Sequence, residues 1–454
     1  MKKIIQFAIL CVFSVVLFSG AMGGNLAMAE NGNSQNAIEK AVWSTQDATV
    51  SESDFCYQDK PSYKIVPKNN DATVYFCLPE FNDQNVNVKK HFTFRIYIEG
   101  TENTYNEFRL YTWGKTLIDY AYPLGKWNFV NFDAELYVRD GNKSLCLNFV
   151  NAENLNIYLS AIEINDDTYS LENILGGVEL YQIARGTHMA VMESYVMVTP
   201  DNKVIVMDGG EAVDAEKLLK VIRRFTNKVD AWFISHFHSD HIDAFLNLFD
   251  YYGSDNDLVV ENLYYDALDL NNPSFNEQES VSRANSINKL VSLQKGKRII
   301  NAIQTSAKQS FKIGQYVTMK VLNDAYFGPS GNPGNNASVV YKMETPGESV
   351  LFLGDLGDRG DYYLNDSSFR NEMKSCRVVQ MAHHGQRGVT DYFYSMIDDI
   401  RVCLYAAPKW VFDNDENGKG VNTSNLDTMH TRDLMRERGV RYSFHAIDKD
   451  IRLG

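Results

Sequence analysis

The sequence predicts two folded parts, an all-β sandwich followed by an α/β domain. From about residue 41 to 168, apolar and polar residues alternate with period two, which is the pattern of strands exposed on one face. From about residue 175, apolar runs typical of strands alternate with segments of helical spacing. The chain has 454 residues, too many for one ordinary core, and 44% of them are apolar, so we expect two or three globular domains.

The N-terminal segment has the pattern of an export signal. Residues 1–29 contain two early lysines, then an apolar run, then the small residues "AMA" before Glu30. An uncleaved membrane anchor is the alternative, because the apolar run approaches spanning length. Residues 30–40, "ENGNSQNAIEK", are polar and predict a linker. We therefore expect a secreted, cell-surface or periplasmic protein without an integral membrane domain after signal removal.

The net charge bears on nucleic-acid binding, and the cysteines bear on disulfide bonding. Removal of residues 1–29 takes away Lys2 and Lys3 and moves the net charge from −14 to −16. This balance argues against a broad electrostatic grip on nucleic acid, although a local basic groove stays open. Five cysteines remain at irregular spacing, so a disulfide framework is not expected. Cys56–Cys77 is the candidate bridge, and we expect the other thiols to be buried and free.

Residues 41–170 predict the sandwich. In "HFTFRIYIEG" the apolar side chains fall on one face, and "SLCLNFV" and "LNIYLSAIEI" repeat the alternation. Turn signals such as "RDGN" separate the runs, and no helical segment intervenes, which favours an antiparallel sandwich. The region is rich in aromatic residues, among them Trp127 and Phe129. These rings either bind sugars or cell-wall polymer at the surface or pack in the core and turns, and both interpretations stay open.

Residues 175–454 predict the α/β domain. "SYVMVT", "KVIVMDGG", "VDAWFIS" and "SVLFLGD" are expected strands, of which the last three end in polar or glycine residues. "DAEKLLKVIRRF" and "ESVSRANSINKLVSL" have helical spacing, and "TMHTRDLMRERG" is an expected helix whose final glycine suits a C-terminal cap.

The stretch "HFHSDH" is the strongest chemical signal. It places His236, His238, Asp240 and His241 within six residues, directly after a buried strand, in a chain with only 9 histidines. Histidines two apart on an extended segment point the same way and can reach one ion. Asp240 and His241 then enter the next helix and can face a second ion. Such a ligand set suits zinc, manganese or iron, and the residues do not choose among them; zinc is the ion that we expect first.

This motif resembles the HxHxDH signature of the metallo-β-lactamase-fold superfamily. "VIVMDGG" is similar to its first motif and places Asp208 beside the metal loop, "LFLGD" is similar to its later aspartate motif, and "MAHHG" is similar to its histidine motif. The resemblance covers residues 175–454 and implies an αββα sandwich. It also implies two divalent ions, both bound by Asp355, with a histidine of the last motif completing the second site.

Within the superfamily, the chain most resembles the DNA-uptake competence branch. The shared element is Asn335-Asn336-x-Ser338 before a strand, followed by Asp355 and the histidine pair. The chain departs from the branch at "ARGTH", where a Gly-Gln-Gly-Asp element is usual, and at Gln386, where serine is usual. It also has no further segment long and apolar enough to span a bilayer. DNA import itself is therefore not expected.

The resemblance assigns roles to individual residues. The first ion is expected at His236, His238 and Asp355, with an Asn335 oxygen or water filling in, because no histidine lies between His241 and His383. The first site should therefore be the looser one. For the second ion we favour His383 as ligand and His384 as a substrate contact, a choice that is nearly even. Expected supporting residues around the ligands are Asp208, Asn335, Asn336 and Ser338.

The predicted function is an exported phosphodiesterase or nuclease that uses a hydroxide between two metal ions. Asp355 would be central to catalysis, and His384 or His430 could protonate the leaving alkoxide. One alternative is a hydrolase of phosphorylcholine or other esters on envelope polymers, with the sandwich as an anchor. Another is a non-catalytic surface-binding protein that keeps a structural metal. A β-lactamase fits less well, because two carboxylate ligands favour the dinuclear phosphodiesterase arrangement.

Overall fold

The computed structural model describes most of the chain after residue 41. The described residues are 42–78, 88–101, 108–112, 115–118, 123–139, 142–185, 191–250, 256–272, 275–416, 418–445 and 449–454. The expected signal segment 1–29 and linker 30–40 lie outside them. Across the described ranges, every helix is too short or too polar to cross a bilayer.

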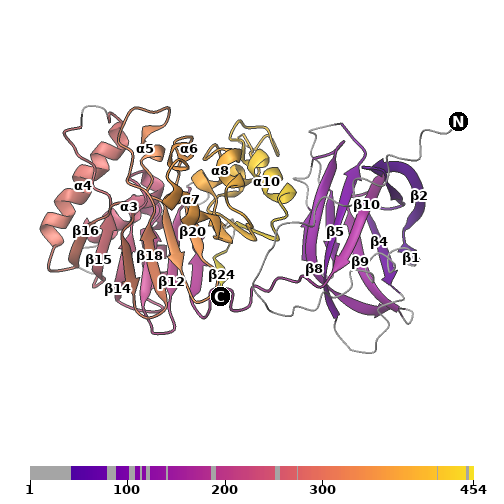
Figure 1. The fold of residues 1–454 in the computed structure, drawn as a ribbon, viewed down its shortest axis with the longest axis horizontal. Helices are drawn as coiled ribbons and strands as arrows, with labels where there is room; N and C mark the ends of the chain where they lie inside the picture. Colours follow the sequence, from indigo (N-terminus) through magenta and orange to yellow (C-terminus); the bar gives the residue numbers. More distant parts are fainter. Residues whose placement is uncertain are drawn as a thin grey trace, which may run out of the picture.

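The N-terminal part is built only of strands, paired antiparallel in two layers (Figure 1). One layer contains β1 (Val42–Gln46), β4 (Asp71–Leu78), β6 (Arg109–Thr112), β7 (Lys115–Ile118) and β9 (Asn142–Val150). The other contains β2 (Ala48–Tyr57), β3 (Lys60–Pro67), β5 (Val88–Ile98) and β10 (Ile157–Asn165). The long strand β8 (Trp127–Arg139) pairs with β5 over most of its length and with β9 at its end, so it joins the layers at a corner.

The alternation in β5 produces the sandwich core as predicted. Phe92, Phe94, Ile96 and Ile98 are buried and pack with apolar side chains of the facing layer. The predicted Cys56–Cys77 bridge is wrong. Cys77 is buried on β4, whose strand partners are β1 and β9, whereas Cys56 is exposed near the end of β2, and both thiols are free.

The C-terminal part contains two seven-stranded sheets. The first has, in spatial order, β16 (Ile299–Gln304), β15 (Val259–Tyr265), β14 (Lys228–Phe233), β13 (Val204–Asp208), β12 (Ser194–Val198), β11 (Glu179–Gln182) and β24 (Ile451–Leu453). The second has β17 (Ser310–Ile313), β18 (Val317–Val321), β19 (Tyr341–Glu344), β20 (Val350–Phe352), β21 (Val378–Gln380), β22 (Val402–Tyr405) and β23 (Tyr442–His445). Buried rings of Tyr195, Phe233, Tyr341 and Phe352 pack between the sheets.

Helices cover the outer face of each sheet and complete four layers (Figure 1). The first sheet packs against α2 (Ala215–Ile222), α3 (Ser239–Asp250) and α4 (Gln278–Gln294). The second packs against α7 (Ser367–Lys374), α8 (Asp391–Ser395) and α10 (Thr428–Glu437). The predicted fold class, a β-sandwich followed by an αββα sandwich, is confirmed.

Ion pairs join the two parts along one edge. Arg95 of β5 pairs with Glu437 at the end of α10 at 2.5 Å, and Glu437 also accepts a hydrogen bond from the Phe129 amide. Nearby, the buried carboxylate of Asp133 accepts a hydrogen bond from Arg441, at 3.0 Å. The α10 helix therefore extends from the histidine motif at its start to the sandwich at its end.

Candidate metal centre

The predicted ligands lie where strands of the two sheets end. His236 and His238 occupy the loop between β14 and α3, and Asp240 and His241 form the first turn of α3. Asp355 follows β20, and the histidine pair lies in the short helical turn η3 (Ala382–Gly385) after the neighbouring parallel strand β21. Side chains at the carboxyl ends of such strands meet at one edge of an α/β fold, where ligands bind.

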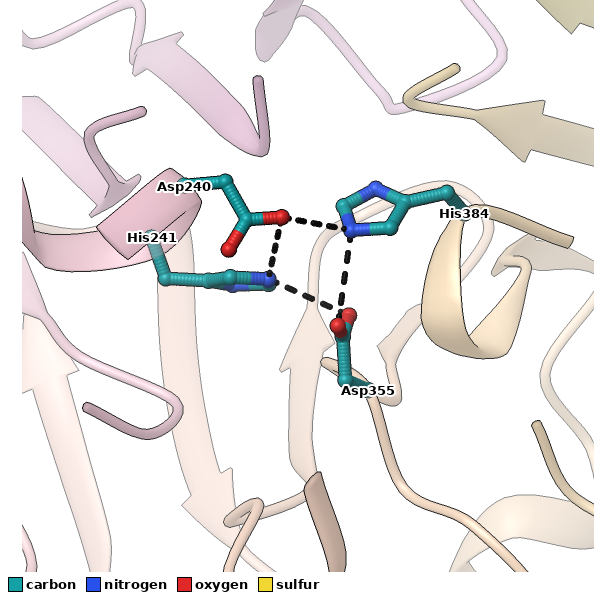
Figure 2. A group of neighbouring side chains, drawn as sticks. All are labelled: Asp240, His241, Asp355 and His384. Carbon is teal, nitrogen blue, oxygen red and sulfur yellow. Dashed lines mark ion pairs between the residues drawn. The ribbon is translucent and has the colours of Figure 1, made fainter. Parts of the chain in front are cut away.

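One group of four side chains forms a closed ring, which Figure 2 shows. His384 Nε2 lies 3.0 Å from Asp240 Oδ2 and 3.4 Å from Asp355 Oδ2. His241 Nε2 lies 3.1 Å from Asp355 Oδ1 and 3.8 Å from Asp240 Oδ2. Two carboxylates and two imidazoles thus converge from α3, η3 and the loop after β20, with the spacing of ligands around one cation.

A second group shares Asp355 with the first. His236, His238 and Asp355 each offer a ligand atom within 4.8 Å of the others, and His236 Nε2 lies 4.0 Å from Asp355 Oδ2. Gly334 makes room for this group, because a Cβ at that position would lie 2.0 Å from His238 Nε2. Asp355 therefore lies between the two groups, with Oδ2 near His384 of one and His236 of the other.

The chemistry of these donors fits metal ions. The buried Nε2 atoms of His236, His241 and His384 and one oxygen of Asp355 make no hydrogen bond of good geometry within the described residues, only the ion-pair contacts given above. Such atoms are costly to bury unless a cation or a proton occupies the space between them. Burial opposes the charged forms of His241 and His384, but the surrounding carboxylates, with Asp355 the strongest of them, together outweigh it and hold the pKa of both imidazoles well above the usual range. The group thus attracts positive charge.

Asp208 fixes the orientation of a predicted ligand. Its carboxylate accepts hydrogen bonds from the amide and hydroxyl of Ser235, both at 2.7 Å, and lies 2.9 Å from His241 Nδ1. Because Nδ1 faces this carboxylate, Nε2 of His241 is free to face the ring of ligands. Asp208 is buried and belongs to neither ligand group.

The Asn335–Ser338 segment supports the loops from the other side. Ser338 Oγ accepts a hydrogen bond from the Asp355 amide at 3.0 Å. Asn336 bonds Asp358 and the Arg359 amide, which ties the segment to the loop after Asp355. Asn335 Nδ2 lies 3.1 Å from His383 Nε2, while its buried Oδ1 has no hydrogen-bond partner.

The two adjacent histidines take positions opposite to those we favoured. His384 is buried and joins the four-residue ring, whereas His383 lies 3.8 Å from Asp355 Oδ2 with its side chain 21% exposed. Positive φ angles of 52° and 59° at the pair turn the imidazoles in different directions. The sequence does not tell which of the two imidazoles points inward, because this left-handed turn decides it.

His430 belongs to neither ligand group. Its side chain is 62% exposed on α10, and Nε2 pairs with Asp391 at 2.9 Å. The structure therefore does not bring His430 to the reacting centre as the sequence interpretation expected. His188, from the "ARGTH" segment, lies outside the described residues.

Sequence reasoning missed two carboxylates beside the ligands. Glu193 is buried, with Oε2 3.5 Å from His384 Nδ1, and burial raises its pKa to about 7. Glu277 caps α4 and lies 4.0 Å from His238 Nε2. A lone acid in the apolar run "AVMESYVMV" was the available signal for Glu193, whereas nothing local marked Glu277.

Residues 190–283 match the family model described as Metallo-beta-lactamase superfamily. No curated protein matches the chain.

Among solved structures, Zn(2+)-bound PqqB from Methylobacterium extorquens is 8% identical over 61% of this chain and 99% of its own, with a TM-score of 0.35. Unliganded yeast PDE1 is 11% identical over the same shares, with a TM-score of 0.40. A long form RNase Z from yeast is 13% identical over 50% of this chain and 36% of its own, with a TM-score of 0.34. With TM-scores below 0.5, these likenesses carry no argument about substrate. The superfamily match and the two ligand groups together support a metal-dependent hydrolase.

Proposed function

We propose that this protein is a metal-dependent phosphodiesterase with two divalent ions, zinc first among the candidates. The observation that carries the proposal is that both ligand groups share Asp355. A shared carboxylate places two cations side by side, which is the arrangement that clamps the oxygens of a phosphodiester during displacement. A single structural metal would need only one of the groups.

The bound ions would supply Lewis-acid charge and make water acidic enough to attack at neutral pH. The remaining roles belong to the side chains. Asp240, His241, Asp355 and His384 hold one ligand ring, and Asp208 keeps His241 in the required orientation. His383 is partly exposed beside Asp355 and can reach a leaving alkoxide, so we assign it the proton donation that we first gave to His384 or His430.

The finer assignments rest on the sequence. The Asn335–Ser338 element and its contacts to Asp355 and His383 support a relation to the competence branch of the superfamily. The N-terminal segment supports export to the cell surface, the periplasm or the medium. Substrates in that location include nucleic acid and phosphodiester polymers of the envelope.

Hydrolysis of bis-p-nitrophenyl phosphate by the zinc-loaded protein tests the proposal. Asp355→Ala should abolish turnover, because it removes a ligand from both groups, while far-UV circular dichroism stays unchanged. Asp398→Ala is a matched control, since Asp398 is 64% exposed and pairs only with the surface residue Lys374 among the contacts described. Undiminished turnover in Asp355→Ala, or absence of turnover in the wild-type protein, would refute the proposal.

A change of leaving group tests the role of His383. Loss of a general acid slows departure of a poor leaving group by about 10²–10⁴-fold but hardly affects an acidic phenol. His383→Gln should therefore slow hydrolysis of an alkyl phosphodiester far more than that of the p-nitrophenyl ester. Equal losses on both substrates would assign His383 to metal binding instead.

A further inference from the structure

The outer face of one sandwich sheet carries a cluster of aromatic side chains. Tyr158, Tyr97 and Trp127 are directly opposite one another on β10, β5 and β8, where their neighbours along each strand point into the core. Phe55 and Tyr57, from the end of β2, pack over this row. We call these five side chains the aromatic face.

The rings of the aromatic face pack together at the surface. The Phe55 ring lies 4.7 Å from that of Tyr97, 4.8 Å from that of Tyr158, and is stacked at 5.3 Å on Trp127. Phe55 is nevertheless 41% exposed, and the other four are half-buried. A contiguous apolar cluster on the solvent-facing side of a sheet is one mark of a binding surface.

The charges around the aromatic face argue against a polyanionic ligand such as a nucleic acid. Arg95 lies over Tyr57 but pairs with Glu437, and Lys60 pairs with Glu163 at 3.3 Å. Lys64 lies over the Tyr158 ring. A nucleic acid would need unpaired cations along its backbone, and a protein of net charge −14 offers little long-range attraction.

The size of the aromatic face speaks against a protein partner. An aromatic side chain has about 150–250 Å² of surface, and most of it is covered at four of these five positions. The exposed remainder is well below the roughly 800 Å² per partner of a standard protein interface. Flat rings tipped by three phenol hydroxyls instead suit the C–H faces and hydroxyls of sugar rings.

We infer that the aromatic face binds a carbohydrate chain. The face adjoins the catalytic part, because Arg95 lies over the Tyr57 ring and pairs with Glu437 at the end of α10. At its other end α10 begins at Thr428, which lies against Gly385 of the histidine motif. Ten helical residues span about 15 Å, so α10 separates the sandwich from the histidine motif by about that length. The binding itself does not rest on the proposed hydrolase function.

Affinity electrophoresis of the full chain tests this inference. The protein carries Asp355→Ala, so that hydrolysis cannot disturb the result, and migrates through gels that contain dextran, xylan or glucomannan; purified cell-wall sacculi serve as an insoluble probe. At least one of these glycans should retain the protein. Phe55→Ala and Trp127→Ala should each weaken binding by about tenfold, with Trp127→Phe restoring most of it.

Tyr137→Ala is the matched control, because Tyr137 is 39% exposed on β8 but lies outside the aromatic face. It should bind glycan like the parent protein, and thermal melting should show that all variants are folded. Failure to bind any of the four probes would overturn the inference. Binding that survives Phe55→Ala and Trp127→Ala would also overturn it, as would single-stranded DNA binding or dimerisation that these substitutions abolish. Hydrolysis of bis-p-nitrophenyl phosphate by Trp127→Ala on the wild-type background should be unchanged, which separates this inference from the proposed function.

Discussion

Gly334→Ala should empty the first metal site and spare the second. The added Cβ would lie 2.0 Å from His238 Nε2, whereas nonbonded carbon and nitrogen atoms approach to about 3.5 Å, so the imidazole must move by about 1.5 Å. Misplacement of a reacting group by about 1 Å can cost on the order of 10²-fold in rate. Alanine also suits the short helix α5 (Pro333–Asn336) that contains this residue, so the fold itself should not suffer.

Metal analysis after dialysis against zinc-containing buffer measures this effect. The wild-type protein should retain two ions, and Gly334→Ala should retain one and hydrolyse bis-p-nitrophenyl phosphate about 100-fold more slowly. Gly331→Ala is the control from the same loop, because a Cβ there meets nothing within 4 Å. Two ions and normal turnover in Gly334→Ala would show that His238 is not a ligand.

Further predictions concern metal removal, the ligand support and pH. Stepwise chelation should release one ion before the other, because the first group has three side-chain ligands and the second has four; simultaneous release would contradict this. Asp208→Asn puts an amide where Ser235 and His241 need a carboxylate acceptor, and should lower the free energy of unfolding of the metal-free protein by roughly 2–4 kcal/mol in urea titrations, with Asp398→Asn as an unaffected control. Burial, opposed by a hydrogen bond from the Ala325 amide, raises the pKa of Asp266 to about 6. Its neutral form is therefore the one that folding favours, and the resulting stability is lost as pH rises through about 6. Asp266→Asn should raise the melting temperature at pH 7.5 but not at pH 3.5, and an equal change at both pH values would disprove the assignment.

Much of the fold could be predicted because its signals are local. The alternation Phe92–Ile98 and the helical spacing of "DAEKLLKVIRRF" depend on burial of one face, which the sequence displays directly. The HxHxDH run is also a local signal, and it identified the ligands that lie in the loop after β14 and in the first turn of α3. The order of His383 and His384 depends on two positive φ angles, and the failed Cys56–Cys77 pairing depends on which strands are neighbours. Neither is a local property.

The residues that lie beside the ligands could not be identified from the sequence as the ligands could. Gly334 matters because His238, almost a hundred residues earlier, folds against it, and Glu193 matters because His384 arrives from the other sheet. Single residues of common types carry no periodic signal, so their roles emerge only when the two sheets are placed face to face. Metal ligands form a motif, whereas the residues that give them space do not.

The contact between Asp133 and Arg441 has a consequence for anyone who divides this chain. Asp133 belongs to the sandwich and is 6% exposed, yet the guanidinium that neutralises it is supplied from near the C-terminus, after the last helix. Expression of the sandwich alone would leave an anion in a dry environment with only His91, Lys89 and a backbone amide beside it. Loss of the sole partner of a buried charge typically costs about 3–5 kcal/mol, and the cost here should be smaller because His91 and Lys89 remain. The sandwich thus takes part of its stability from a side chain that lies 308 residues later in the chain.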